Sequence, residues 1–110
     1  MSWSAGGPSN NNDTFTGSAN GDSPAGAQNG NDSLVGNNGN DSLRGEGNND
    51  TIRGGEGNDT LLGGNGSDWL FGDAGNDSLL GDGQGGAGSE ADTMDGGTGN
   101  DTIVAVDGND

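Results

Sequence analysis

Apolar side chains recur at every ninth position through the middle of the chain. Between Gly36 and Leu80 the sequence consists of five contiguous nine-residue units, GNNGNDSLR, GEGNNDTIR, GGEGNDTLL, GGNGSDWLF and GDAGNDSLL. In each unit a glycine stands first, an aspartate sixth and an apolar residue eighth. The apolar series is Leu43, Ile52, Leu61, Leu70 and Leu79. A short, fixed period of this kind predicts a repeat architecture.

The residue types divide each unit into a turn and a strand. Positions one to six are rich in Gly and Asn and predict a turn, because these residues adopt a positive φ at low cost. Asn48 stands where other units have glycine, and Asn is the next best residue for this backbone region. Positions seven to nine predict a short strand whose middle side chain points inward. Two units then form one full coil with a strand on each side.

The same pattern divides the chain into a lead-in and one repeat domain. Residues 1–12 carry no pattern and are expected to form a disordered lead-in, and residues 13–110 are expected to form the repeat domain. Phe15 holds the eighth position of the first recognisable unit. Residues 17–25 form a poor copy with Pro24 at the apolar position, and one extra residue then shifts the frame before Asp32. A chain of this length predicts a single domain at most.

Two departures from the pattern lie toward the C-terminus. The step from Asp77 to Asp92 is longer than nine residues, which predicts an irregular insertion at about residues 82–91. Met94 and Ile103 then resume the apolar series. The pattern stops at Asp110, the sixth position of a further unit. Because solenoids need polar terminal caps, the C-terminus is expected to be truncated.

The composition changes this picture, because it is typical of a disordered chain. Only 24% of the residues are hydrophobic, 27 are glycine and the formal net charge is −16. Such a chain does not bury enough apolar surface to offset the ordering of its backbone. The repeats therefore need a further stabilising partner that is positively charged and favours oxygen ligands.

The residue types present and absent restrict this partner. Eighteen Asp and Glu residues stand against two Arg, and the chain has no His, Cys or Lys. Zinc, haem and iron–sulfur sites are excluded because their ligands are missing, and so are disulfides. A chain this acidic repels nucleic acid, and no apolar run is long enough for a membrane span. A signal peptide is not expected, because no charged-then-apolar segment precedes Trp3. A hard divalent cation remains.

Stacking of the coils brings the sixth-position aspartates into two columns. Neighbouring aspartates of a column come about 4.8 Å apart, the spacing of paired strands. Unpaired carboxylates at this distance repel by about 3–4 kcal/mol at an effective dielectric constant of about 20. A divalent cation between neighbours turns this repulsion into attraction. One column holds Asp13, Asp32, Asp50, Asp68, Asp92 and Asp110, and the other holds Asp22, Asp41, Asp59, Asp77 and Asp101.

Calcium fits this arrangement best. It accepts about six to eight oxygens in flexible geometry, including backbone carbonyls, whereas magnesium requires a near-ideal octahedron and keeps its waters. The glycine-rich turns supply such carbonyls. Several calcium ions are therefore expected, at least four of them in the gaps that keep the regular spacing, which are Asp32/Asp50, Asp50/Asp68, Asp41/Asp59 and Asp59/Asp77.

The units GGEGNDTLL and GGTGNDTIV resemble the calcium-binding nonapeptide of the RTX, or haemolysin-type, family, and the resemblance covers about residues 13–110. It implies an all-β fold, a right-handed parallel β-roll with calcium between its turns. It also implies an extracellular module, exported by type I secretion, whose calcium-dependent folding serves a larger secreted protein.

The resemblance further implies a ligand set. Aspartates at position six and carbonyls near positions one, two and four hold calcium in the family. The aspartates would be Asp32, Asp41, Asp50, Asp59, Asp68, Asp77, Asp92 and Asp101. The carbonyls would come from Gly36, Asn37, Gly39, Gly45, Glu46, Asn48, Gly54, Gly55, Gly57, Gly63, Gly64, Gly66, Gly72, Asp73 and Gly75.

Other interpretations of these residues fit less well. A low-complexity acidic linker does not keep an apolar residue two places after each aspartate. An EF-hand needs a glutamate at its twelfth position and helical flanks, which glycine interrupts here. A phosphate-binding loop lacks its lysine, and no carboxylate stands beside a His, Cys or Lys that would single it out for catalysis. The chain is therefore expected not to be an enzyme.

Outward-facing positions leave two questions open. Trp69 and Phe71 are expected to point to solvent on one face, and Leu62 and Leu80 to lie one above the other on the opposite face. These residues are either incidental or contact a neighbouring domain of the same polypeptide or another chain. An ice-binding or adhesin-type surface is the alternative function, because Asn recurs at position five. Position three varies from unit to unit, however, so no lattice-matching surface is expected.

Overall fold

The chain is described by a computed structural model that covers residues 2–3, 12–22, 26–82 and 90–105, and these ranges contain strands and turns without a helix. Accordingly, none of the described residues forms a helix able to cross a membrane. The strands are β1 (Ser2–Trp3), β2 (Thr14–Thr16), β3 (Ser33–Asn38), β4 (Ser42–Gly47), β5 (Thr51–Glu56), β6 (Thr60–Asn65), β7 (Trp69–Ala74), β8 (Ser78–Asp82), β9 (Thr93–Asp95) and β10 (Thr102–Val104).

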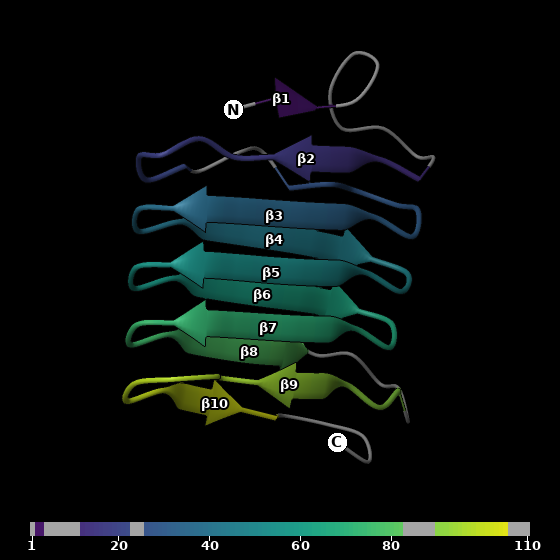
Figure 1. Cartoon of the computed structure of the whole chain (residues 1–110). Coiled ribbons are helices and arrows are strands. Elements are labelled where there is room, and N and C mark those ends of the chain that lie inside the picture. Colours follow the sequence, from purple (N-terminus) through teal and green to yellow (C-terminus); the bar gives the residue numbers. More distant parts are fainter. Residues whose placement is uncertain (1, 4–11, 23–25, 83–89, 106–110) are drawn as a thin grey trace.

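From β3 onward the strands alternate between two sheets that are stacked into a flat roll (Figure 1). One sheet has the order β1-β2-β3-β5-β7-β9, and the other has the order β4-β6-β8-β10. Every pairing is parallel except that of β1 with β2. Successive units therefore lie on opposite sheets and two of them complete one coil, which confirms the predicted parallel β-roll.

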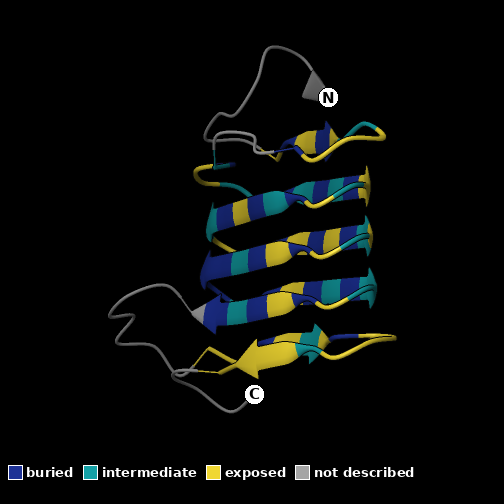
Figure 2. Cartoon of the chain, turned by 90° about the vertical axis from the view of Figure 1, so that its left-hand side faces the viewer, coloured by how far each residue is buried: buried dark blue, intermediate teal, exposed yellow. Residues whose placement is uncertain are grey.

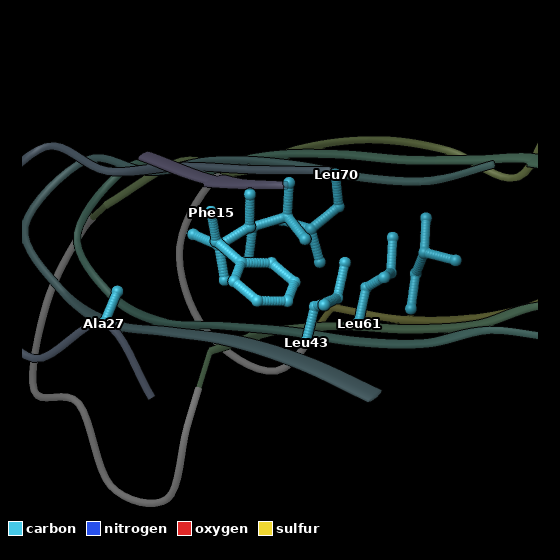
Figure 3. Packing of buried hydrophobic residues seen from close by; sticks show 8 residues of the cluster. Phe15, Ala27, Leu43, Leu61 and Leu70 are labelled. Carbon is cyan, nitrogen blue, oxygen red and sulfur yellow. The ribbon is translucent and has the colours of Figure 1, made fainter. Parts of the chain in front are cut away.

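The inward apolar residues form one continuous core between the sheets. Ile52 of β5 pairs in register with Leu34 of β3 and Leu70 of β7. Figure 3 shows Phe15 and Leu70 reaching inward from one wall and Leu43 and Leu61 from the other. The fully buried apolar residues are Phe15, Ala27, Leu34, Leu43, Ile52, Leu61, Leu70 and Leu79, and Met94 packs against them. The predicted series of buried apolar positions is confirmed from Leu43 to Leu79.

Buried and exposed residues alternate along the strands (Figure 2). In β5, Ile52 and Gly54 are buried, whereas Thr51, Arg53 and Glu56 are exposed. Positions eight and one of successive units thus face the interior. The sixth-position aspartates are buried as well, from Asp13 to Asp92. The interior of the roll therefore holds an apolar column flanked by carboxylates.

The strands are longer than the sequence pattern predicted. β5 covers positions seven to nine of one unit and one to three of the next, and β3, β4, β6 and β7 have the same six residues. The expectation that positions one to six form the turn is therefore wrong for positions one to three. They belong to the sheet because their backbone also pairs between coils, as Gly55 does with Asp73. Only positions four to six remain as the turn.

The unit that contains Asp32 differs from the later units in the residue type at its first position. Asn29 bridges to Gly47, and the Ala27 N–H donates to the Arg44 carbonyl at 3.1 Å. Both contacts place Ala27 at position one, where later units have glycine. Figure 3 shows Ala27 beside, rather than within, the column of larger side chains. Pro24, the residue expected at the apolar position of the poor copy, lies outside the described residues.

The structure describes only some of the residues at the expected domain limits. In the lead-in, Ser2–Trp3 pair as β1 with β2, while residues 1 and 4–11 lie outside the described residues. In the insertion, residue 82 ends β8 in register with Gly64, and residues 83–89 lie outside. The expected truncation concerns residues 106–110, which also lie outside. Ile103 pairs in register with Leu79 but is 47% exposed. The limits of the repeat domain stay a prediction.

Candidate metal centre

The sixth-position aspartates form two hydrogen-bonded columns. The Asp32 N–H donates to Asp50 Oδ1 at 2.8 Å, and the Asp50 N–H donates to Asp68 Oδ1 at the same distance. One column runs through Asp13, Asp32, Asp50, Asp68 and Asp92, and the other runs through Asp22, Asp41, Asp59, Asp77 and Asp101. Each described member lies in the column predicted for it. Asp110 lies outside the described residues.

The second carboxylate oxygen is buried without a hydrogen-bond partner in five of these residues. This holds for the Oδ2 atoms of Asp32, Asp41, Asp50, Asp59 and Asp77, whose residues are at most 3% exposed. A buried polar atom without a partner costs free energy, and a buried charge costs more. A backbone N–H thus satisfies one oxygen of each of these carboxylates, whereas the other oxygen requires a positively charged ligand.

Burial raises the pKa of these carboxyl groups. The pKa of Asp50 rises to about 7, because the effect of burial, with repulsion from Asp68 and Asp32, exceeds the lowering effect of the hydrogen bond from the Asp32 backbone. The pKa of Asp59 rises to about 6, again chiefly through burial. Burial is also the largest cause of the raised pKa values of Asp32, Asp41 and Asp77. Full ionisation of the columns is therefore unfavourable unless a cation compensates it.

The Oδ2 atoms of Asp41, Asp50, Asp59 and Asp77 each lie beside the first-position glycine of their own unit. A Cβ atom placed on Gly36 would collide with Asp41 Oδ2 and would lie 2.6 Å from the Gly54 carbonyl oxygen of the next coil. The same arrangement of glycine, carboxylate oxygen and carbonyl oxygen recurs at Gly45, Gly63 and Gly72. The missing side chain leaves a space that is bounded by oxygens of two successive coils. We call this space the glycine cradle.

Positions two and four of the units have a backbone that favours glycine. The angle φ is 78° at Asn37, 83° at Glu46, 72° at Asn48 and 72° at Asp73. The glycines at these two positions from Gly39 to Gly99 also have a positive φ. Positive φ at Asn48 fits the expectation for asparagine, and aspartate such as Asp73 is also enriched in this region, whereas glutamate such as Glu46 does not predict it.

Carbonyl groups at positions two and four lie against the next coil. A Cβ atom on Gly55 would collide with the Asn37 carbonyl oxygen, and one on Gly57 with that of Gly39. The carbonyl oxygens of Glu46, Asn48, Gly57, Asp73 and Gly75 stand in the same relation to the glycine of the following coil. Backbone carbonyls therefore form rows along the turns, parallel to the carboxylate columns.

The structure brings two groups of predicted ligands together and places the third nearby. The aspartate Oδ2 atoms and the first-position carbonyls meet at the glycine cradles, whereas the carbonyls of positions two and four line the turns. Within the described ranges no three carboxylate side chains gather around one point. A cation at a cradle would therefore need backbone carbonyls in addition to carboxylates. Such a set of hard oxygens fits calcium.

The sequence pattern did not predict a second ladder, formed by the asparagines of position five. The Asn58 N–H donates to Asn40 Oδ1 at 2.9 Å, and the Asn76 N–H donates to Asn58 Oδ1 at 2.9 Å. The bond recurs from Asn31 to Asn12, from Asn49 to Asn31, from Ser67 to Asn49 and from Asn100 to Asn76. Recurrence of Asn was the available signal. Because these amide oxygens bond within the stack, they do not support the ice-binding alternative.

The outward residues lie where the pattern predicted, and Phe71 interacts with an arginine. Trp69 is 54% exposed, with its ring 6.2 Å from that of Phe71. Arg53 lies over the Phe71 ring at 5.3 Å and pairs with Asp73 at 3.4 Å. On the other sheet, Leu62 is in register with Leu80, and Leu80 with Val104.

The sequence profile of the RTX calcium-binding nonapeptide repeat (4 copies) matches residues 27–61, 54–86 and 86–110. No curated protein and no solved structure was found to match the chain. The matched repeats begin at Ala27, the residue that the structure places at the first position of a unit, and they cover well over half of the sequence. The described residues form the parallel all-strand solenoid expected of these repeats. The chain belongs to the RTX calcium-binding nonapeptide repeat family.

Proposed function

We propose that this chain binds several calcium ions between successive coils and folds as they bind. The observation that carries the proposal is that the two oxygens of a column carboxylate have different surroundings. In Asp50, one oxygen accepts the Asp32 N–H at 2.8 Å, and the other is buried without a hydrogen-bond partner. The second oxygen lies at a cradle with the Gly63 carbonyl oxygen of the next coil.

The proposed ligands come from three positions of the unit. The carboxylates are those of Asp32, Asp41, Asp50, Asp59, Asp68, Asp77, Asp92 and Asp101. First-position carbonyls from the next coil, such as that of Gly54, share the cradle with them. Carbonyls of positions two and four complete the shell. Bound calcium supplies the positive charge that offsets the buried carboxylates.

Calcium-dependent folding is inferred from the same contacts. The core contains one buried apolar residue in each regular unit, and the glycine-rich backbone loses much conformational entropy on ordering. The carboxylates of a column also repel each other when they are ionised. An ion that binds only the folded roll shifts the equilibrium toward it by mass action. The calcium-free chain is therefore expected to be unfolded at neutral pH.

Circular dichroism with a calcium titration tests this proposal. The chain should show little β signal in excess EDTA and should gain it cooperatively at about millimolar calcium, since extracellular calcium modules bind in about this range. Magnesium at the same concentration is the matched control and should leave the chain unfolded. A full β signal in EDTA would contradict the proposal, and equal folding with either ion would indicate screening of charge alone.

We infer further that the roll is a structural module of a secreted protein and has no catalytic role. Family membership supports this inference, because the repeat family is a structural calcium-binding module. Export by type I secretion fits this role. The chain would stay unfolded before export, where calcium is scarce, and would fold outside the cell. Limited proteolysis tests the expected difference: rapid digestion in calcium-free buffer and protection in calcium. Equal digestion in both would exclude this role.

A further inference from the structure

The turn formed by residues 17–22 holds its aspartate differently from the later turns. The Ser18 N–H donates to Asp22 Oδ2 at 2.5 Å, and the Ser18 hydroxyl donates to Asp22 Oδ1 at 3.3 Å. The corresponding Oδ2 atoms of Asp41, Asp59 and Asp77, the next three aspartates of this column, have no hydrogen-bond partner. In this turn, the Ser18 N–H thus binds the carboxylate oxygen whose counterparts in those three aspartates are open to a cation.

The backbone of this turn also departs from the pattern. Ser18 stands at position two and Asn20 at position four, and neither has a positive φ. At the same positions of the next turn of this column, Asn37 and Gly39 have φ values of 78° and 106°. The Ser18 hydroxyl closes the turn further, because it accepts the Asn20 N–H at 3.2 Å. The turn is therefore organised by its own hydrogen bonds.

The first-position carbonyl of this turn is occupied as well. The Asn37 side-chain amide of the next coil donates through Nδ2 to the Gly17 carbonyl oxygen at 2.9 Å. In the later turns the first-position carbonyl is one of the oxygens that bound a cradle. A Cβ atom on Gly17 would meet Asp22 Oδ2 and the Gly36 carbonyl oxygen, the pair of oxygens that bounds the later cradles, but here the carboxylate oxygen of that pair already accepts the Ser18 N–H.

The turn is nevertheless part of the stack. The Asp22 N–H donates to Asp41 Oδ1 at 2.6 Å, and the Ser42 N–H donates to the Asp22 carbonyl at 2.8 Å. The Gly17 N–H donates to the Val35 carbonyl at 2.7 Å. The turn therefore continues the column of aspartates, with the Oδ2 atom of its aspartate occupied by a backbone N–H.

We propose that residues 17–22 form an ion-free cap, in which N–H groups of Ser18 and Asn37 take the place of calcium, and that the calcium sites of this column begin at the Gly36 cradle with Asp41. This inference rests on the proposed function, since it concerns where the ion array ends. It predicts that Asp22, although buried in the column, is not a calcium ligand.

Calcium binding by two matched variants tests the cap. Asp22→Asn and Asp41→Asn each remove one buried charge from the same column and keep a side-chain oxygen as acceptor. Calcium stoichiometry is measured by isothermal titration calorimetry on the full chain. Asp22→Asn should bind as many ions as the parent, with a midpoint within about twofold, and Asp41→Asn should lose at least one ion. Loss of an ion in Asp22→Asn would overturn the cap.

The parent chain separates failure of the cap from failure of the proposed function. A parent that binds no calcium contradicts the proposed function itself, whereas a parent that binds calcium makes the comparison decisive. If Asp41→Asn does not fold, the parent and Asp22→Asn still decide the question. The Ser18 amide gives a second readout by NMR of the calcium-loaded chain. It should be protected from exchange in the parent and lose protection in Asp22→Ala, and an unchanged amide would also overturn the cap.

Discussion

The backbone N–H of Asp50 donates to Oδ1 of Asp68 at 2.8 Å. A hydrogen bond thus joins two residues whose carboxylates repel each other. The amide orients the Asp68 carboxylate, and repulsion from that carboxylate contributes to the raised pKa of Asp50, whose largest cause is burial. Substitution by asparagine keeps an acceptor for the amide and removes the charge. It therefore separates the geometric role of an aspartate from its electrostatic role.

Asp59→Asn is expected to raise the calcium midpoint of folding about tenfold, which corresponds to about 1.4 kcal/mol. Asp59 lies between Asp41 and Asp77 in its column, so loss of its charge affects the gap on each side. The measurement is a calcium titration followed by far-ultraviolet circular dichroism.

Glu56→Gln is the matched control, because it removes one charge from the same unit at an exposed side chain. Its midpoint should stay within about twofold of the parent, since an exposed charge contributes little. If the two variants shift the midpoint equally, net charge and not position determines calcium binding.

Acid is expected to stabilise the calcium-free roll. Burial raises the folded-state pKa of Asp50 to about 7 and of Asp59 to about 6, above the ordinary value of 3.8. The folded state therefore binds more protons than the unfolded state between these values. The resulting stabilisation is fully present below 3.8 and is lost as the pH rises through 6 to 7. Circular dichroism in EDTA should show more β structure at pH 4.5 than at pH 7.5.

Calcium-linked proton release provides a check on the pH prediction. If the calcium-free chain is unfolded at pH 7, its carboxyl groups are already ionised, and calcium binding releases few protons. A folded calcium-free roll would instead release protons from groups such as Asp50. Calorimetry in buffers of different ionisation enthalpy distinguishes the two, and substantial release at pH 7 would contradict an unfolded calcium-free chain.

Ala27→Gly is expected to lower the calcium midpoint, because the Ala27 methyl group stands at position one, where later units have an open cradle. Glycine in place of alanine also costs about 0.5–1 kcal/mol in backbone entropy. This cost opposes folding, so a lower midpoint requires that the opened cradle strengthens binding at Asp32 by more than this amount.

Gly36→Ala is the reciprocal change, since its methyl group would collide with Asp41 Oδ2. Its calcium midpoint should rise several-fold, and titration calorimetry of both variants beside the parent measures the two shifts. Shifts of the same sign would show that the first position does not control access to the aspartate.

Asn58→Ala is expected to lower the free energy of unfolding of the calcium-loaded roll by about 0.5–1.5 kcal/mol, through loss of one side-chain hydrogen bond. The Asn58 side chain accepts the Asn76 N–H at 2.9 Å. Urea denaturation at saturating calcium measures the effect. Asn65→Ala, at an exposed position of β6, is the control and should change the free energy of unfolding by less than about 0.5 kcal/mol. Equal effects would exclude a stabilising role for the ladder.

The nine-residue period alone predicted the two-unit coil and both aspartate columns. It did so because strand pairing fixes which residues stack, as Ile52 on Leu34 illustrates. The period could not predict how far each strand extends. Residue types at positions one to three indicate a turn, yet the sheet draws the Gly55 backbone into pairing with Asp73.

The first coil shows where local sequence fails. Ala27 and Ser18 are small residues that a pattern search treats as imperfect copies of glycine. Only the structure shows that Ala27 is buried at position one and that the Ser18 N–H reaches Asp22 Oδ2. The hydrogen-bonded amide ladders were likewise hidden, since the sequence shows which residues recur but not which groups of the next coil they meet.

The hydrogen bond from the Asp68 N–H to Asp92 Oδ1 has the same 2.8 Å length as the one from Asp50 to Asp68, although it spans 24 residues along the chain instead of 18. The stacking of the roll thus depends on where each aspartate lies, and not on the number of residues between successive aspartates. A longer connection is tolerated wherever the next aspartate returns to its column. In evolutionary terms, this junction is a point at which a gene can acquire new sequence without losing the frame of its repeats. For engineering, the connection after residue 82 is accordingly the natural place to graft a loop, an epitope or a reporter peptide.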